Sequence, residues 1–138
     1  MNEEDANRLM GLDMLMESME FFMDKIKERE DMYSELVSEF RTICLNPYVY
    51  SKALKKEAFQ KLEDTHKELM TLQLKQKSDF KTHKNFLNRE LKGHIDESLR
   101  VGALKKISKL SKSFDKCMKF QEKTMTEVRN LNDIEIDI

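Results

Sequence analysis

Residues 9–44 read LMGLDMLMESMEFFMDKIKEREDMYSELVSEFRTIC, and this stretch decides the fold class. Apolar side chains recur along it in alternating steps of three and four residues, and only Glu30 interrupts the pattern. This spacing is typical of an α-helix with one apolar stripe and coiled-coil periodicity. We therefore expect a helix from about Glu4 to Leu45. Asn46-Pro47 follows, and proline cannot continue a helix.

The remainder of the chain predicts two more helices. From Ser51 to Leu99 the apolar residues are spaced near 3.6, which indicates one long helix, although Ser78-Asp79 could cap a new one. Gly102 is the expected C-cap, and a third helix runs from about Ala103 to Leu131. The predicted fold is all-α, an elongated antiparallel three-helix bundle with coiled-coil character, or four helices if the second breaks near Ser78.

The expected helix lengths point to a partner chain. The second helix is expected to be longer than either neighbour, so part of its apolar seam would lie uncovered in a lone monomer.

Residues 1–131 form a single elongated helical domain in this interpretation, and residues 132–138 form a flexible acidic and apolar tail. Tyr48, Val49 and Tyr50 follow the first helix, and we expect them to cover the end of the bundle or, alternatively, to form a recognition tip.

Composition and motifs argue against an enzyme. The chain contains only 3 glycines and 1 proline, and it lacks a Gly-rich phosphate loop and any HExxH, CxxC or GxSxG motif. Glu63-x-x-His66 matches half of a di-iron site, but the second such pair is missing. We therefore expect no catalytic residue, metal, cofactor or small-molecule substrate.

The compartment is predicted from the N-terminus and the cysteines. MNEEDANR is acidic where a signal peptide is basic, and no apolar stretch is long enough to span a membrane. Cys44 and Cys117 lie on predicted helix faces and are expected to be reduced, small apolar side chains rather than a disulfide. We expect an intracellular protein of the cytoplasm or the nucleus.

The first predicted helix has an unusual methionine content. Seven of the chain's 10 methionines lie in residues 1–32, and residues 9–23 are apolar over more than half of the helix circumference. One interpretation is a core helix wedged between the other two, and the other is an exposed ridge that takes a partner helix. The residues predicted to bind a partner are Met16, Met19, Phe21, Phe22 and Met23.

Six lysines of the third predicted helix follow one another in steps of four and three residues, opposite its apolar seam. They are Lys105, Lys109, Lys112, Lys116, Lys119 and Lys123. This ridge is interpreted as a solvated face, as a site for an acidic protein surface, or as a site for lipid or nucleic acid phosphates. The acidic surface considered is the strip Asp13, Glu17, Glu20 and Asp24 of a second copy. Nucleic acid is disfavoured because the ridge carries no arginine and no interleaved aromatic side chain.

The sequence thus favours a non-enzymatic protein–protein interaction scaffold or adaptor. It would self-associate or join a larger helical assembly through helix packing, with charge strips setting the register. The alternative is a peripheral membrane-binding module that uses the lysine ridge against anionic lipid.

Overall fold

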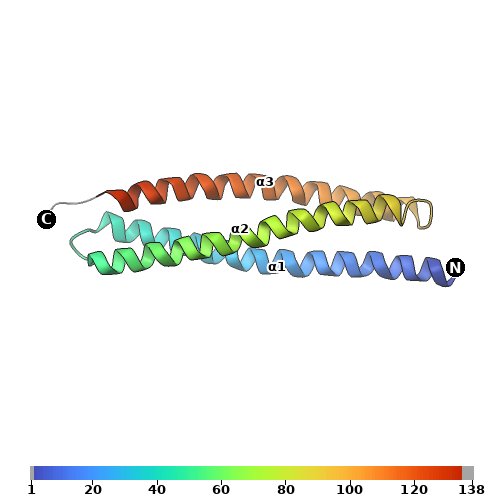
Figure 1. The fold of residues 1–138 in the computed structure, drawn as a ribbon, viewed down its shortest axis with the longest axis horizontal. Coiled ribbons are helices and arrows are strands. Elements are labelled where there is room, and N and C mark those ends of the chain that lie inside the picture. The colour runs from blue at the N-terminus through green and yellow to red at the C-terminus, as the bar shows by residue number, and fades with distance from the viewer. Residues whose placement is uncertain (1, 135–138) are drawn as a thin grey trace. The chain divides into compact units, whose positions relative to one another are not determined.

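The computed structural model describes residues 2–134 and contains three helices (Figure 1). They are α1 (Glu3–Leu45), α2 (Lys52–Arg89) and α3 (Glu97–Asp133). The predicted all-α fold is confirmed, and the described residues contain no strand. Because α2 continues unbroken through Ser78, the four-helix alternative is wrong.

Local capping explains the first two boundaries. At the start of α1, the backbone N–H of Asp5 donates to Oδ1 of Asn2 at 2.8 Å. At the start of α2, the N–H of Leu54 donates to Oγ of Ser51 at 3.1 Å. Both are N-cap hydrogen bonds, which satisfy backbone donors that a first helical turn leaves unpaired. The α1 boundaries lie within about one residue of those predicted.

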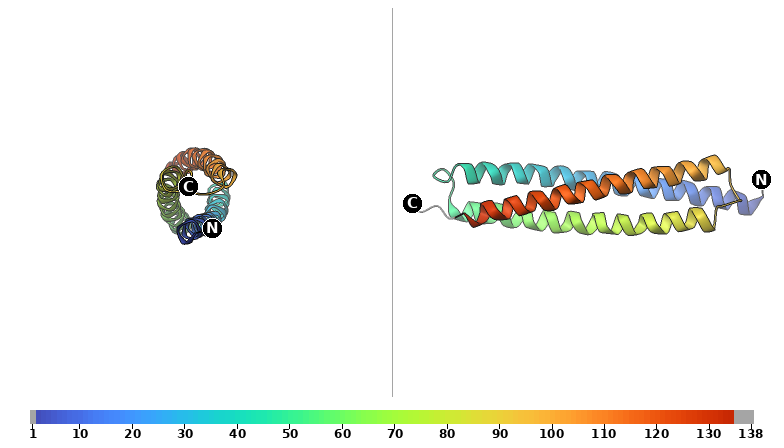
Figure 2. Two further views of the ribbon diagram at one scale, coloured as in Figure 1. Left: turned by 90° about the vertical axis from the view of Figure 1, so that its right-hand side faces the viewer. Right: turned by 90° about the horizontal axis from the view of Figure 1, so that it is seen from above.

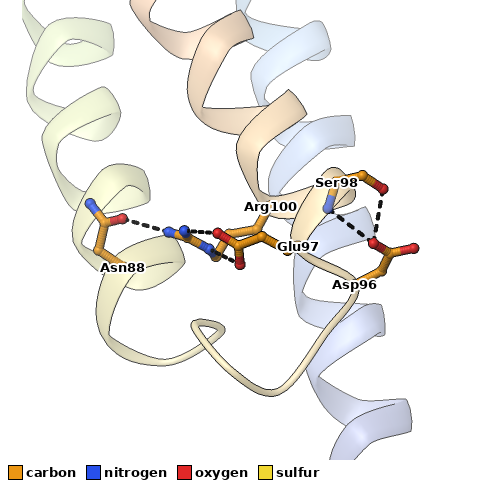
Figure 3. Close-up of polar contacts among 5 residues, drawn as sticks. All are labelled: Asn88, Asp96, Glu97, Ser98 and Arg100. Atoms are coloured by element: carbon orange, nitrogen blue, oxygen red, sulfur yellow. Dashed lines mark hydrogen bonds and ion pairs between the residues drawn. The ribbon is translucent and has the colours of Figure 1, made fainter.

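The boundary between α2 and α3 differs from the prediction. Gly102 lies inside α3 and is not a C-cap, whereas Gly93 adopts φ +81° in the turn, a conformation that favours glycine. The cap of α3 is Asp96, whose Oδ1 accepts from the backbone N–H of Ser98 at 3.0 Å (Figure 3). Arg100 then joins the two helices, because it donates to Oδ1 of Asn88 at 2.9 Å and pairs with Glu97.

This earlier boundary changes the helix lengths. The helices have 43, 38 and 37 residues, so the second is shorter than the first and nearly equal to the third. The expected overhang of the second helix is therefore wrong, and it gives no argument for a partner chain. The third helix continues through Asp133, two residues into the predicted tail. Residues 135–138 of that tail lie outside the described residues.

The chain divides into two compact units, and each helix contributes to both. Unit 1 comprises Met1–Lys25 and Gln73–Lys116, and unit 2 comprises Ile26–Leu72 and Cys117–Ile138. Within a unit each helix segment packs on the other two as a three-helix bundle, which the views of Figure 2 illustrate. The neighbours along the chain are antiparallel: in unit 1, for example, α1 packs Gly11 against Phe86 of α2 and Phe22 against Lys75.

The core of unit 1 contains large apolar side chains from all three helices. Phe80 of α2 contacts Phe114 of α3, with ring centroids 5.6 Å apart. A Cβ atom on Gly11 would lie 3.2 Å from the Phe86 ring, so glycine allows α1 and α2 to approach closely there. Buried apolar members of this core are Leu12, Leu15, Met19, Phe80, Leu87, Leu91, Ala103, Ile107 and Phe114.

The core of unit 2 combines apolar and aromatic side chains with buried hydroxyl groups, among them that of Tyr33. Phe40 is fully buried against Phe59, with ring centroids 5.7 Å apart. The Tyr33 hydroxyl donates to the backbone oxygen of Gln121 at 3.1 Å, and burial raises the pKa of Tyr33 to about 12. This hydrogen bond gives the buried hydroxyl an acceptor on α3. Buried apolar members of this core include Ile26, Tyr33, Val37, Phe40, Leu62, Leu69, Met125 and Val128.

Candidate protein-interaction surfaces

The five residues predicted to bind a partner do not lie on one accessible face. Met19 is only 1% exposed and belongs to the core of unit 1. Met16, Phe22 and Met23 are half-buried, and Phe22 lies 4.8 Å from the Lys75 ammonium, which sits over its ring. Phe21 alone points outward, with 66% of its surface exposed. In this fold, therefore, Met19 is unavailable to a partner.

A different set of apolar side chains forms an exposed face on α1. Met10, Met14 and Phe21 are 60%, 63% and 66% exposed, and all three belong to unit 1. Their spacing of four and seven residues places them on one line of the helix, opposite the buried residues Leu12 and Met19. We call Met10, Met14 and Phe21 the apolar face of α1. The sequence does not separate these exposed residues from the buried ones, because the apolar arc of residues 9–23 is too wide to show which side of the helix faces the core.

Acidic side chains flank the apolar face. Asp13, Glu17, Glu20 and Asp24, the acidic strip of α1, are all exposed. Glu20 forms an ion pair with Lys106 of α3, with 3.4 Å between Oε1 and Nζ. A shallow groove of about 260 Å³ lies beside this pair and is lined by Met19, Glu20, Met23, Asp24, Lys106 and Leu110. The thioethers of the helix thus divide between the core, this groove and the outer face.

All six lysines of the predicted ridge on α3 are exposed. Four of them, Lys105, Lys109, Lys112 and Lys116, belong to unit 1, and the other two belong to unit 2. In unit 1 an open hollow of about 380 Å³ lies along the ridge, lined by Val101, Leu104, Lys105, Ser108, Lys109 and Lys112. The hollow combines two half-buried apolar side chains with three ammonium groups, so it suits an occupant that is both apolar and acidic.

The turn between α1 and α2 exposes a second apolar group, in unit 2. Leu45, Tyr48 and Val49 are 78%, 77% and 74% exposed. Tyr48 and Val49 therefore do not cover the end of the bundle by packing onto it, as one interpretation of the sequence expected. Tyr50 is half-buried.

Several titratable side chains lie buried or half-buried in unit 2. His66 lies beside Tyr33, with ring centroids 5.6 Å apart, and burial lowers its pKa. Glu63 forms an ion pair with Arg129 at 3.6 Å. Burial raises the pKa of the thiols of Cys44 and Cys117, which are free cysteines and are held in the protonated, weakly nucleophilic form.

In residues 2–134, no group of three or more His, Cys, Asp or Glu side chains could hold a metal ion. Within the same range, none of the helices has a stretch that is both apolar and long enough to cross a lipid bilayer. No family model matches the chain, and it has no match among the curated proteins or the solved structures.

Proposed function

We propose that this protein is a non-enzymatic helical interaction module that binds a protein partner through the apolar face of α1. The observation that carries the proposal is the exposure of Met10, Met14 and Phe21 on one line of a helix whose opposite side is already buried. Apolar residues gathered on one exposed helix face are typical of helix-to-helix recognition. Methionine adapts to the shape of its partner because its side chain is unbranched and flexible.

The size of the face limits the affinity that it can supply. Burying an exposed Met or Phe side chain contributes about 1.5–3 kcal/mol, so three that are already partly covered contribute about 3–5 kcal/mol. Association itself costs about 4 kcal/mol or more. The apolar face alone therefore supports weak binding, and the flanking acidic strip must add contacts, specificity or rate of encounter.

Site-specific photo-crosslinking tests this function. A photoreactive phenylalanine analogue at Met14 or at Phe21 is expected to yield discrete crosslinked protein adducts in a native cell extract. The same analogue at Lys61, an exposed α2 position in unit 2, serves as the matched control and is expected to yield none. Adducts at Met14 should disappear when Met10 and Phe21 are both replaced by Glu, because two charges would then need desolvation.

The adduct pattern decides the outcome. Equal labelling at Met14 and Lys61, or adducts that survive the double Glu replacement, would contradict a specific interaction through the apolar face. Circular dichroism of the double variant provides the fold control, since both replaced side chains are more than half exposed and their loss leaves the core intact.

A second function is favoured by one specific observation on α3 in unit 2. Phe120 is 70% exposed, and Lys119 and Lys123 lie next to it and one turn away on the same helix. An exposed aromatic side chain among lysines suits the interface of an anionic membrane, where the ring enters the headgroup region and the ammonium groups attract phosphate. Sedimentation with phosphatidylserine vesicles is the measurement that separates this function from protein binding.

A further inference from the structure

The acidic strip of α1 and the lysine ridge of α3 have the same spacing. Asp13, Glu17, Glu20 and Asp24 follow one another in steps of four, three and four residues. Lys105, Lys109, Lys112 and Lys116 repeat these steps. Each set extends over twelve residues, about 16 Å of helix, and all eight side chains are exposed and lie in unit 1. Two helices with these strips can therefore face each other in register.

The charges on these strips are mostly left unpaired by the fold. In the part of the chain that the structure describes, no ion pair involves Lys105, Lys109, Lys112 or Lys116, and none involves Asp13, Glu17 or Asp24. Residues 3–25 carry seven acidic and two basic side chains, whereas residues 97–116 carry six basic and two acidic ones. The two surfaces are thus complementary in sign and are open to another molecule.

Each charged strip has an apolar neighbour. At 100° per residue, the apolar face of α1 lies about 70° to one side of the acidic strip, and Val101 and Leu104 of α3 lie about 80° from the lysines in the opposite sense. When two facing helices run in the same direction, the clockwise side of one meets the anticlockwise side of the other. In that parallel orientation the acids meet the lysines. Met10 and Met14 then lie level with residues 102 and 106, beside Val101 and Leu104 of the hollow, while Phe21 lies about two turns further along α3, level with residue 113. The antiparallel orientation would set apolar side chains against charges.

We propose that the partner is a second copy of this chain, whose α1 docks in parallel on the lysine ridge and the adjoining hollow of α3. This inference rests on the proposed function, because it uses the apolar face of α1 as the inserted surface. In this register Asp13 faces Lys105, Glu17 faces Lys109, and Asp24 faces Lys116 of the other copy. Each copy carries both the acidic strip and the lysine ridge. The contact can therefore repeat from copy to copy, either closing into a ring, of which a reciprocal two-fold dimer is the smallest, or continuing as an open chain.

Charge reversal on each surface tests the pairing. The α1 variant carries Asp13→Lys, Glu17→Lys and Asp24→Lys, and the α3 variant carries Lys105→Glu, Lys109→Glu and Lys116→Glu. Glu20 is left unchanged because it pairs with Lys106 in its own chain. At low ionic strength, light scattering is expected to give at least twice the mass of one chain for the wild type and the mass of a single chain for each variant.

The two variants together provide the sharper test. Each carries like charges on both surfaces, so alone it repels itself, but the two variants are complementary to each other. An equimolar mixture is expected to recover the wild-type association, and so is one chain that carries all six replacements. If association were non-specific, it would not follow this pattern of loss and recovery.

Matched controls move the same charges to other exposed positions. The control for the α1 variant carries Glu28→Lys, Glu35→Lys and Glu39→Lys, which change the net charge by the same amount. The control for the α3 variant carries Lys52→Glu, Lys56→Glu and Lys61→Glu on α2, which likewise reproduce its change in net charge. Both controls are expected to keep the wild-type mass. Circular dichroism should show wild-type helicity for every variant, since all the replaced side chains are exposed.

Several outcomes would overturn the inference. The inference is overturned if the wild type remains a single chain at low ionic strength. If the photoreactive analogue at Met14 still yields protein adducts in extract in that case, the proposed interaction function holds with another partner. Self-association that is lost in the α1 variant but unchanged in the α3 variant places the acceptor elsewhere. An α3 variant that keeps the wild-type mass but no longer sediments with phosphatidylserine vesicles assigns the lysines to lipid.

Discussion

The two units use their charged side chains differently. In unit 2, ion pairs link each helix to both others: Arg29–Glu68 at 3.1 Å, Arg41–Glu127 at 3.3 Å and Arg129–Glu63 at 3.6 Å. In unit 1 the pairs between helices are Lys77–Asp115 and Lys106–Glu20, while the acidic strip and the lysine ridge remain largely unpaired. Exposed ion pairs contribute about 0–1 kcal/mol each, so the contrast matters little for stability. The difference that matters lies in how the unpaired charges are arranged: in unit 1 they gather by sign, with acids along one line of α1 and lysines along one line of α3.

The largest expected effects come from removing a core ring in either unit. Phe40→Ala in unit 2 and Phe80→Ala in unit 1 each leave a cavity, and each is expected to lower the free energy of unfolding by about 3–5 kcal/mol. Urea denaturation followed by circular dichroism measures this. Because each helix passes through both units, we expect one transition and similar shifts for the two variants.

This pair of variants also tests whether the two units differ in stability. Two separate transitions, or a shift in only one variant, would show that the units unfold independently and that their differences extend to stability. Phe120→Ala is the control, because that ring is 70% exposed and its loss is expected to change the free energy of unfolding by less than about 0.5 kcal/mol.

The helix content of the fold was predictable because heptad spacing and breakers act locally. The α1 boundaries follow from the apolar repeat and from Asn46-Pro47, and the start of α2 lies within a residue of its expected position. The α2–α3 boundary was misplaced because Leu91 and Ile95 continue the apolar spacing past the end of the helix. The local signals that set it are the positive φ of Gly93 and the side-chain cap of Asp96.

The interaction surface was only partly predictable. The lysine ridge is exposed as its wheel position suggests, since charged side chains opposite an apolar seam remain in water. The partner face on α1 was not resolved, because residues 9–23 are apolar on too many sides for periodicity to separate Met19, which is buried, from Met14, which is exposed. Packing against two neighbouring helices makes that choice, and the packing depends on residues distant in the sequence.

A smaller effect is expected from the polar side chains buried in the two cores. Gln76 in unit 1 is 1% exposed, and its Nε2 has no hydrogen-bond partner, while Gln121 in unit 2 is 4% exposed with an unpartnered Oε1. Replacing Gln76 by Leu removes the desolvation cost of a buried amide, so the free energy of unfolding is expected to rise by about 1–2 kcal/mol. Urea denaturation of Gln76→Leu and Gln121→Leu compares the two units directly.

The outcome also tests why a glutamine is kept at such a position. A buried polar side chain in a helical core can fix the register of the helices at a cost in stability. A decrease in stability for Gln76→Leu would contradict this account and show that the amide makes a net stabilising contribution. Gln60→Leu, at an exposed α2 position, is the control and is expected to change the free energy of unfolding by less than about 0.5 kcal/mol.

The smallest expected effect is limited to a pH window and concerns His66 in unit 2. Burial lowers its pKa below the ordinary value of 6.5, Arg129 lowers it further, and Glu122 and Glu63 oppose the shift. Below about pH 6.5 the unfolded chain takes up a proton that the folded protein resists. Stability is therefore full above this pH and is lost as the pH falls through the folded pKa.

His66→Phe keeps a ring beside Tyr33 and removes the titrating group. It is expected to lose less free energy of unfolding than the wild type between pH 7.5 and pH 5, measured by urea denaturation at each pH. The pKa of His83 in unit 1 is also lowered by burial, with Asp79 opposing. If His66→Phe follows the wild-type curve while His83→Gln flattens it, the acid sensitivity belongs to unit 1, and the two units then differ in pH response as well as in surface charge.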